Sequence, residues 1–340
     1  MMRLPPFRFR APRSVEDAVA WLAESPADTM LLAGGTDLIP NMKRRQQTPR
    51  TVIALRGIDA LKAIRNGAGF TIGAGVTLTE IVRDDRLRAR CPGLWQAAAQ
   101  VATPHLRNMG TIGGNLCLDT RCTYYDQSLE WRKAIDFCLK KDGKTCWVAT
   151  SSPRCLAVSS TDTAPMLVAL GARVRLASAA GERVVSVGDL YQNDGMRYLT
   201  RRPDELVTDV IVPDQTGWLS AYWKLRRRGS FDFPVASAAV AVRLDGDHVV
   251  EARLALGAVA SRPLLSAKAP ELLIGRALTD DVIAAAADAA YDIAKPMDNT
   301  DFELVWRKRM VKALVTAALR EVRGDDVREL RLRIARQTLS

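Results

Sequence analysis

Apolar residues in the first part of the chain switch between the spacing of a helix and that of short buried strands. They recur at helical spacing after Ser14, which predicts an amphipathic helix with Ser14 as its N-cap and Asp17 as the reciprocal acid of a capping box. Apolar runs at 30–33 and 51–55 predict two buried strands. We therefore expect a small α+β lobe over residues 1–57.

A second, larger lobe is expected over residues 58–215. Its first strand, at 67–75, is bounded by glycines, and helices are expected at 79–90 and around Trp95. Further along, the pattern predicts one helix and two strands, at 165–170, 173–176 and 206–212.

The pattern after residue 215 indicates a third unit, over 216–325. Apolar and alternating segments predict three antiparallel strands, at 219–226, 235–243 and 248–257. Three helices are expected after them, at 264–275, 280–294 and 301–321. An Arg-rich stretch, 326–340, is expected to form a basic tail. The fold class is therefore α+β, with a three-stranded antiparallel sheet and helices in the last domain.

Composition places the chain among globular proteins. Apolar residues make up 48% of it, and no apolar stretch is long enough to cross a bilayer. Residues 1–6 lack the apolar core of a signal peptide, so we expect a cytoplasmic protein without a membrane partner. Lys and Arg (49) outnumber Asp and Glu (38), which leaves a net charge of +11. This charge is spread out and no nucleic-acid motif accompanies it, so phosphate contacts on a solvated basic face are favoured over nucleic-acid binding.

Two glycine pairs, about eighty residues apart, stand in similar surroundings. Gly34-Gly35 follows a predicted strand and precedes Thr36, and Gly113-Gly114 lies between Thr111 and Asn115. Glycine lets successive backbone N–H groups approach one anion without a Cβ in the way, and the flanking side chains add polar donors. One such pair is equally well an ordinary turn, but two of them favour binding of a pyrophosphate from both sides. The chain has no Gly-x-Gly-x-x-Gly, which disfavours a dinucleotide fold of the Rossmann type.

Three segments together resemble the signature of a known family. Leu31 to Leu38, Gly110 to Leu116 and Thr161 to Pro165 are similar to segments of the FAD-binding subunits of molybdenum hydroxylases. That family includes the medium subunit of carbon monoxide dehydrogenase and the flavin domain of xanthine dehydrogenase. The resemblance covers nearly the whole chain. It implies an FAD-binding domain of the vanillyl-alcohol-oxidase (PCMH) type, whose two lobes hold FAD between them, followed by a C-terminal α+β domain.

The resemblance also implies which residues bind the FAD. The two glycine segments would surround the pyrophosphate, Val101 would pack against the cofactor, and Leu206 would pack against the flavin. Asp162 would hydrogen-bond the sugar-like chain, and Lys224 would place a cation near the ring, where it would stabilise reduced, anionic flavin. No residue is expected to act as a general acid or base. The full implied set is Leu31, Leu32, Ala33, Gly34, Gly35, Thr36, Asp37, Leu38, Val101, Thr111, Ile112, Gly113, Gly114, Asn115, Asp162, Leu206 and Lys224.

Most members of this family lack the polar segment 117–160, which holds five of the six cysteines of the chain. A long insertion with little core of its own needs an internal staple. Four cysteines follow the spacing Cys122-x15-Cys138-x7-Cys146-x8-Cys155. On spacing alone they could bind a [4Fe–4S] cluster or zinc, or remain free thiols. Cys117 is the rival to one of the four as a ligand.

Within the family, the insertion resembles that of one branch, the β subunits of 4-hydroxybenzoyl-CoA reductase, whose inserted loop binds a [4Fe–4S] cluster. The resemblance implies an electron-transfer subunit that relays electrons from reduced ferredoxin, through FAD and the cluster, to a molybdenum-cofactor α subunit. A γ subunit with [2Fe–2S] clusters would complete an (αβγ)2 assembly. The reaction would be anaerobic, reductive dehydroxylation of 4-hydroxybenzoyl-CoA to benzoyl-CoA.

Two alternatives to this function remain open. One is the FAD subunit of another molybdenum hydroxylase that works oxidatively and whose insertion is a docking loop without iron. The other belongs to a different class and is a zinc-stapled binding module, in which the glycine pairs are ordinary turns.

Overall fold

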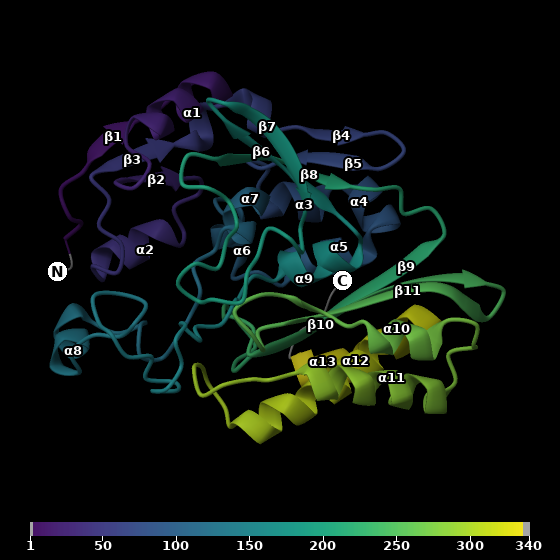
Figure 1. The fold of residues 1–340 in the computed structure, drawn as a ribbon. Coiled ribbons are helices and arrows are strands. Elements are labelled where there is room, and N and C mark those ends of the chain that lie inside the picture. Colours follow the sequence, from purple (N-terminus) through teal and green to yellow (C-terminus); the bar gives the residue numbers. More distant parts are fainter. Residues whose placement is uncertain (1–2, 336–340) are drawn as a thin grey trace.

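The computed structural model describes residues 3–335, which contain three β-sheets (Figure 1). The first sheet belongs to the N-terminal lobe and is parallel, in the order β1-β3-β2. Its strands and the helices of the lobe are β1 (Arg8–Arg10), β2 (Thr29–Leu32), β3 (Thr51–Ala54), α1 (Val15–Glu24) and α2 (Leu38–Lys43). Ser14 caps α1 as predicted, because its side chain accepts a hydrogen bond from the N–H of Asp17. The reciprocal bond to the Asp17 carboxylate, which a capping box requires, is not formed among the described residues.

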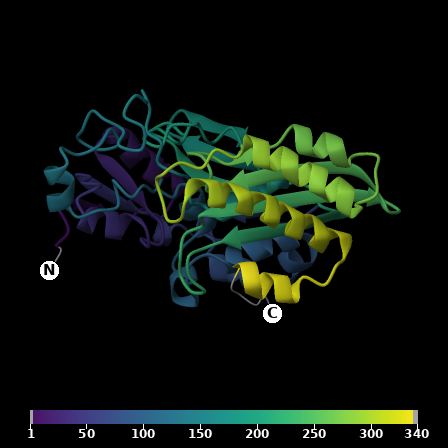
Figure 2. The same cartoon turned by 90° about the horizontal axis from the view of Figure 1, so that it is seen from below.

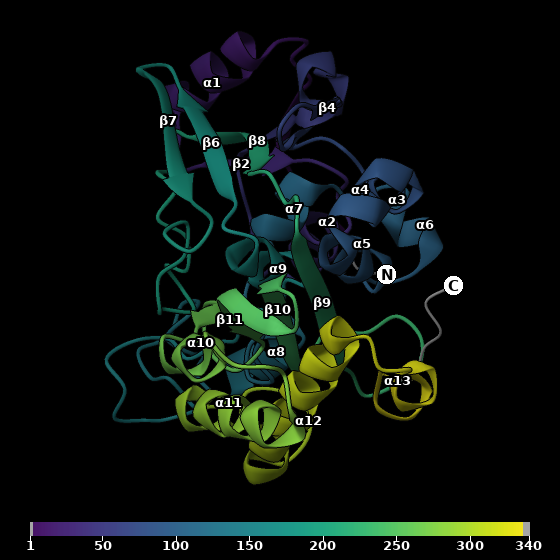
Figure 3. The same cartoon turned by 90° about the vertical axis from the view of Figure 1, so that its right-hand side faces the viewer.

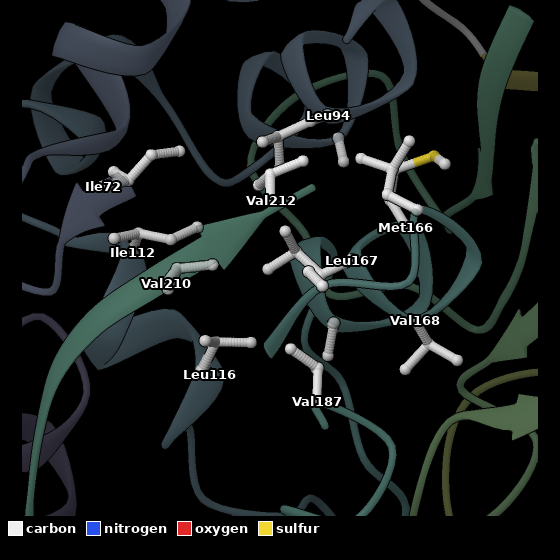
Figure 4. Close-up of a cluster of buried hydrophobic side chains, with 14 of the residues drawn as sticks. Ile72, Leu94, Ile112, Leu116, Met166, Leu167, Val168, Val187, Val210 and Val212 are labelled. Carbon is white, nitrogen blue, oxygen red and sulfur yellow. The ribbon is translucent and has the colours of Figure 1, made fainter. Parts of the chain in front are cut away.

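The second sheet forms the middle of the molecule and has five antiparallel strands in the order β4-β5-β8-β6-β7. These strands are β4 (Ile64–Asn66), β5 (Phe70–Gly73), β6 (Arg173–Ser178), β7 (Gly181–Ser186) and β8 (Leu206–Val212). The helices around them are α3 (Leu78–Arg83), α4 (Asp85–Arg90), α5 (Pro92–Ala99), α6 (Pro104–Arg107), α7 (Ile112–Leu116) and α9 (Thr163–Ala169). Figure 4 shows apolar side chains of β5, α7, α9 and β8 that meet in one buried cluster, among them Ile72, Ile112 and Leu167.

The helix predicted over 79–90 is in fact two helices, α3 and α4. Asp84 separates them, because its backbone leaves the helical conformation and its carboxylate accepts hydrogen bonds from the N–H groups of Arg86 and Leu87. The aspartate thus acts as the N-cap of α4, a role that interrupts a pattern otherwise continuous enough to read as one helix.

The third sheet, in the C-terminal domain, has four antiparallel strands in the order β12-β11-β10-β9. They are β9 (Trp218–Leu225), β10 (Ala236–Asp245), β11 (His248–Gly257) and β12 (Leu264–Leu265). The prediction of three strands was wrong, because it missed a fourth strand, β12, which pairs with Ala255 and Leu256. Two residues are too few to show an alternating pattern, so this segment read as the start of a helix.

Helices cover both faces of the third sheet (Figures 2 and 3). On one face α10 (Lys268–Leu273), α11 (Asp280–Ile293) and α12 (Leu304–Arg323) pack against residues such as Val240 and Leu254. On the other face α5 and α9 of the middle part pack against residues such as Ala239 and Ala255. The sheet therefore joins the C-terminal domain to the middle of the molecule through a continuous core. None of the helices within residues 3–335 is long and apolar enough to span a membrane.

The stretch predicted as a basic tail, 326–340, begins with a helix, α13 (Arg328–Ala335). Arg331 of this helix is buried, pairs with Glu321 at 2.5 Å and lies over the ring of Trp223. At least one of the arginines that led to the prediction of a basic tail is therefore buried in the C-terminal domain. Residues 336–340 lie outside the described part of the chain.

The insertion, residues 117–160, is mostly irregular and has one short helix, α8 (Leu129–Ala134). It lies beside the N-terminal lobe at the lower left of Figure 1. Arg132 donates a hydrogen bond to the carbonyl of Arg44 in that lobe (2.6 Å), and Asn299 of the C-terminal domain donates to the carbonyl of Leu156 (2.6 Å). The contacts of Arg132 and Leu156 therefore fasten the insertion to two different parts of the molecule.

Arg307, near the start of α12, ties together three segments of the C-terminal domain. Its guanidinium donates to the carbonyls of Val235 (3.0 Å), Met297 (2.7 Å) and Ala258 (2.8 Å), and its side chain has no exposed surface. A buried carbonyl that loses its donor keeps the full cost of desolvation.

We expect Arg307→Met to lower the free energy of unfolding by about 3 kcal/mol, because two buried carbonyls and one partly buried carbonyl lose their donor at once. Urea denaturation followed by circular dichroism measures the change. Arg309→Met, two residues along the same helix and exposed, is the matched control and should change stability by less than about 0.5 kcal/mol. Equal effects of the two substitutions would show that the buried hydrogen bonds are not what matters.

Candidate functional site

The two glycine pairs, named here the first turn (residues 34–36) and the second turn (residues 111–114, where Thr111 caps the start of α7), touch each other. A Cβ added at Gly34 would lie 1.8 Å from the carbonyl oxygen of Met109, just before the second turn, and one added at Gly114 would lie 3.5 Å from the Cβ of Ala33. No side chain can approach a carbonyl oxygen as closely as the first distance requires, so the contact depends on glycine at position 34. Two segments far apart in the sequence thus form one surface.

The two turns use their backbone N–H groups differently. In the second turn, Gly113 donates to the carbonyl of Ala74 (2.9 Å) and Gly114 donates to Oγ1 of Thr111 (3.0 Å). In the first turn, no hydrogen bond within the described residues uses the N–H groups of residues 34–36. The first turn therefore has donors available for an anion, whereas the second is held in shape by its own bonds.

Asn115 joins the second turn to the segment that follows the insertion. Its Oδ1 accepts hydrogen bonds from Oγ1 of Thr161 (2.7 Å), and from both the N–H (3.2 Å) and Oγ1 (2.7 Å) of Thr163. All three groups are buried. The amide side chain thus places Asp162 next to the glycine turns, although the insertion separates them in the sequence.

Two neighbouring cavities share the surface formed by the turns. The first, of about 460 Å³, is lined by residues of the N-terminal lobe and the second sheet, including Leu206. The second, of about 290 Å³, extends to the C-terminal domain and is lined by Val101 and Asp162. Gly34 and Gly114 line both cavities, so the turns lie where the cavities meet. This arrangement suits an elongated ligand with an anionic middle and a larger group at each end.

Lys224 lies behind the second cavity, outside its lining. Its Nζ donates to Oδ2 of Asp162 (3.0 Å) and to the carbonyls of Gln100 (3.0 Å) and Asp232 (2.9 Å), and the side chain is fully buried. The hydroxyl of Tyr222 donates to the other oxygen of Asp162 (2.8 Å). Burial raises the pKa of Asp162 and lowers the pKa of Lys224, while the attraction between the two charges opposes both shifts. The ammonium of Lys224 is therefore paired with a carboxylate that lines the cavity, although Lys224 itself does not line it.

Most residues that the family resemblance implies as cofactor ligands line these cavities. Those in the lining are Leu31, Ala33, Gly34, Gly35, Thr36, Asp37, Leu38, Val101, Thr111, Gly113, Gly114, Asn115, Asp162 and Leu206. Leu32, Ile112 and Lys224 are outside it. Leu32 packs within the N-terminal lobe, and Ile112 points into the core of the middle part (Figure 4). Their contact with a cofactor stays a prediction.

Several lining residues were not identified from the sequence. Tyr198 borders both cavities, and its hydroxyl donates to the carbonyl of Cys117 (3.1 Å). Asp119, Phe231 and Phe233 border the second cavity. All of them belong to irregular segments without helical or strand periodicity, so no pattern signalled them.

The four cysteines predicted as metal ligands gather in one place. Cys122, Cys138, Cys146 and Cys155 border a small cavity of about 10 Å³, which has room for about one water molecule. All four are buried and none forms a disulfide. Burial raises the pKa of the Cys122 thiol to about 12 and that of Cys155 to about 11. Within residues 3–335, no group of three or more His, Cys, Asp or Glu side chains is arranged to hold a single metal ion.

The remaining two cysteines lie elsewhere. Cys117, the rival ligand, borders the two cofactor cavities and not the cysteine cavity. Cys91 is part of the core of the middle part, where burial raises the pKa of its thiol to about 12. The structure thus brings together the same four thiols that the sequence singled out.

Comparison with known families covers nearly the whole chain. Residues 5–215 match the family described as the FAD binding domain in molybdopterin dehydrogenase, and residues 220–322 match the CO dehydrogenase flavoprotein C-terminal domain. The first match includes both glycine turns and the Asp162 segment, and it spans more than half of the chain.

Individual relatives agree with this assignment. The carbon monoxide dehydrogenase medium chain of Afipia carboxidovorans is 30% identical over 320 residues, which cover 94% of this chain and 97% of that protein. The nicotinate dehydrogenase FAD-subunit of Eubacterium barkeri is 29% identical over 314 residues, which cover 91% and 93%. A crystal structure of the cyanide-inactivated Cu,Mo-CO dehydrogenase shares the fold, with a TM-score of 0.78 and 30% identity over 95% of this chain and 99% of that chain. The protein therefore belongs to the family of FAD-binding medium subunits of molybdenum hydroxylases, which are oxidoreductase subunits.

Proposed function

We propose that this protein is the FAD and [4Fe–4S] electron-transfer subunit of a 4-hydroxybenzoyl-CoA reductase. It relays electrons from reduced ferredoxin to a molybdenum-cofactor α subunit, which removes the phenolic hydroxyl of 4-hydroxybenzoyl-CoA. A γ subunit with [2Fe–2S] clusters completes an (αβγ)2 assembly. The observation that carries the proposal is that four cysteines meet within an insertion whose other residues, such as Asp119, line the second cofactor cavity. The net charge of +11 suits an acidic donor such as ferredoxin.

Four thiols around one cavity are a ligand set that both a [4Fe–4S] cluster and a zinc ion use, and the proposal favours the cluster because the insertion also lines a cofactor cavity. Each thiolate of such a cluster binds a different iron, so the four sulfurs surround a volume and do not converge on one ion. The thiols here border one cavity, which has the volume of about one water molecule. Because the cavity is small, the four side chains must move apart when a cluster binds. A cluster supplies single-electron transfer, and its binding displaces the thiol protons.

The cofactor cavities support one orientation of FAD. The flavin ring is placed in the second cavity, because the buried cation Lys224 stands behind that cavity and Phe233 lines it. The pyrophosphate then meets the available N–H groups of residues 34–36, and the adenosine occupies the first cavity. In this orientation Leu206 contacts the adenosine and not the flavin, which differs from the role that the family resemblance implied.

A second candidate is the FAD subunit of another molybdenum hydroxylase that works oxidatively. The relatives favour it, since they include a carbon monoxide dehydrogenase and a nicotinate dehydrogenase. In that case the insertion serves for docking and holds no iron. The alternative from a different class, a zinc-stapled binding module with ordinary glycine turns, is wrong, because both domains match flavoprotein families.

We expect Gly34→Ala to weaken FAD binding at least about tenfold, because the added methyl group would meet the carbonyl of Met109 and force the two turns apart. FAD released from purified protein by denaturation measures occupancy. Gly67→Ala is the matched control, since a Cβ at that position meets no atom within 4 Å, and it should retain full occupancy. A folded Gly34→Ala variant with normal FAD content would contradict a pyrophosphate site at this contact.

Protein purified without oxygen should contain about four irons and four sulfides per chain beyond those of its partner subunits. Cys138→Ser should abolish the EPR signal of the reduced cluster while FAD remains bound. Cys117→Ser should keep the cluster, because this thiol lies outside the cysteine cavity. Protein with FAD but without the additional iron would exclude the reductase proposal and support the second candidate.

A further inference from the structure

The second cofactor cavity has more acidic than basic groups in its lining. Its charged lining residues, within the described part of the chain, are Asp37, Asp119, Asp162, Asp232 and Arg228. FAD contains a pyrophosphate, and its ring becomes anionic on reduction. Uncompensated carboxylates in the lining would therefore oppose both FAD binding and flavin reduction. Cations outside the lining are therefore needed to compensate the charge of these carboxylates.

Each of the four aspartates is paired with a cation. The pairs are Asp37 with Arg121, Asp119 with Lys140, Asp162 with Lys224 and Asp232 with Arg228. Three of these cations, Arg121, Lys140 and Lys224, lie outside the lining of the cavity. Two of the four belong to the insertion, 117–160, and the other two belong to the C-terminal domain. The insertion thus supplies half of the compensating charges.

Lys140 lies between the cysteine cavity and the second cofactor cavity. Its side chain, which is 6% exposed, borders the cysteine cavity. On the other side its Nζ donates to Oδ1 of Asp119 (2.8 Å), Oγ1 of Thr120 (2.7 Å) and the carbonyl of Gly195 (2.7 Å). The ammonium also lies 5.5 Å from the ring centre of Tyr198, which borders both cofactor cavities. Lys140 therefore acts on the flavin cavity through Asp119.

We propose that Lys140 is a positioning residue of the flavin site, which neutralises Asp119 and thereby keeps the wall formed by the insertion from disfavouring reduced flavin. The insertion then has a role at the flavin that does not require an iron–sulfur cluster. This inference rests on the proposed placement of the flavin ring in the second cavity.

The test is the midpoint potential of the bound flavin in the full-length protein, measured by reductive titration with reference dyes. Lys140→Met leaves Asp119 uncompensated. At a fixed solution potential the ratio of reduced to oxidised flavin should fall about tenfold, which is a shift of about 30 mV for a two-electron couple. Asp119→Asn should shift the potential in the opposite direction. The double variant Asp119→Asn with Lys140→Met should return to within about threefold of the unmodified ratio.

The double variant separates charge from structure. If Lys140 mattered only through its hydrogen bonds to Thr120 and Gly195, removal of the charge on Asp119 would not restore the potential, and the inference would be overturned. Lys141→Met removes the same charge from the next residue, which pairs with Asp142 at 3.3 Å, and should leave the potential unchanged. Should Lys140→Met fail to fold, Asp119→Asn decides alone, since a fall or no change in potential there overturns the inference.

Lys224→Met checks the placement of the ring. If it changes the potential and Lys140→Met does not, the inference on Lys140 fails while the ring placement stands. If neither substitution changes the potential, the ring placement fails as well. Iron determined on the same samples shows separately whether the insertion holds a cluster.

Discussion

The contact between Gly34 and the carbonyl of Met109 is the constraint on which the cofactor site depends. It brings the N-terminal lobe against the middle part of the molecule at a point with no room for a side chain. The two turns that meet there have different roles. The second turn uses its N–H groups to hold its own shape, so it offers a fixed surface. The first turn keeps the N–H groups of residues 34–36 available and can bind an anion without rearrangement. The two cofactor cavities meet at this contact.

A single buried amide links the two ends of the long irregular segment 117–160. Oδ1 of Asn115 accepts three hydrogen bonds from Thr161 and Thr163, which close the ends of the inserted segment. The entropic cost of closing a loop grows only slowly with its length, so the chain between these ends can lengthen with little effect on the site. The extra segment folds outward and rests on both the N-terminal lobe and the C-terminal domain. The segment can therefore vary beside the second cavity without displacing Asp162.

The charges around the second cavity are arranged in pairs, with the acid in the lining and, in three of the four, the cation behind it. A buried ion pair costs desolvation energy, and removal of one partner leaves the other charge buried alone. Such pairs are thus poor contributors to stability but effective at setting the local potential. Lys224 in β9 and Lys140 in the insertion each pair, from outside the lining, with an aspartate of the lining, although they belong to different domains. The surroundings of the second cavity are therefore built by the whole chain and not by the two FAD-binding lobes alone.

The sequence by itself determined the elements whose signal is local. Helical and alternating spacing identified α1, α5, α11 and the long strands β9 to β11, because these periodicities record which side of an element is buried. The four clustered cysteines were also recognisable, and so were the glycine pairs, whose resemblance to the FAD-binding subunits of molybdenum hydroxylases is confirmed. Shorter features were not recognisable. β12 has only two residues, and Asp84 interrupts a helix through a cap that the apolar pattern does not record.

Only the tertiary structure decided how the recognised residues share the site. It separated the donors of the first turn from the satisfied N–H groups of the second, and it placed Leu206 and Lys224 at different cavities. It also brought Lys140 to Asp119, and Tyr198 to the wall of both cavities. Lys140 and Tyr198 lie in irregular segments, where spacing carries no information on burial. A sequence pattern records separation along the chain, whereas the electrostatics and the shape of a cofactor site depend on distances across it.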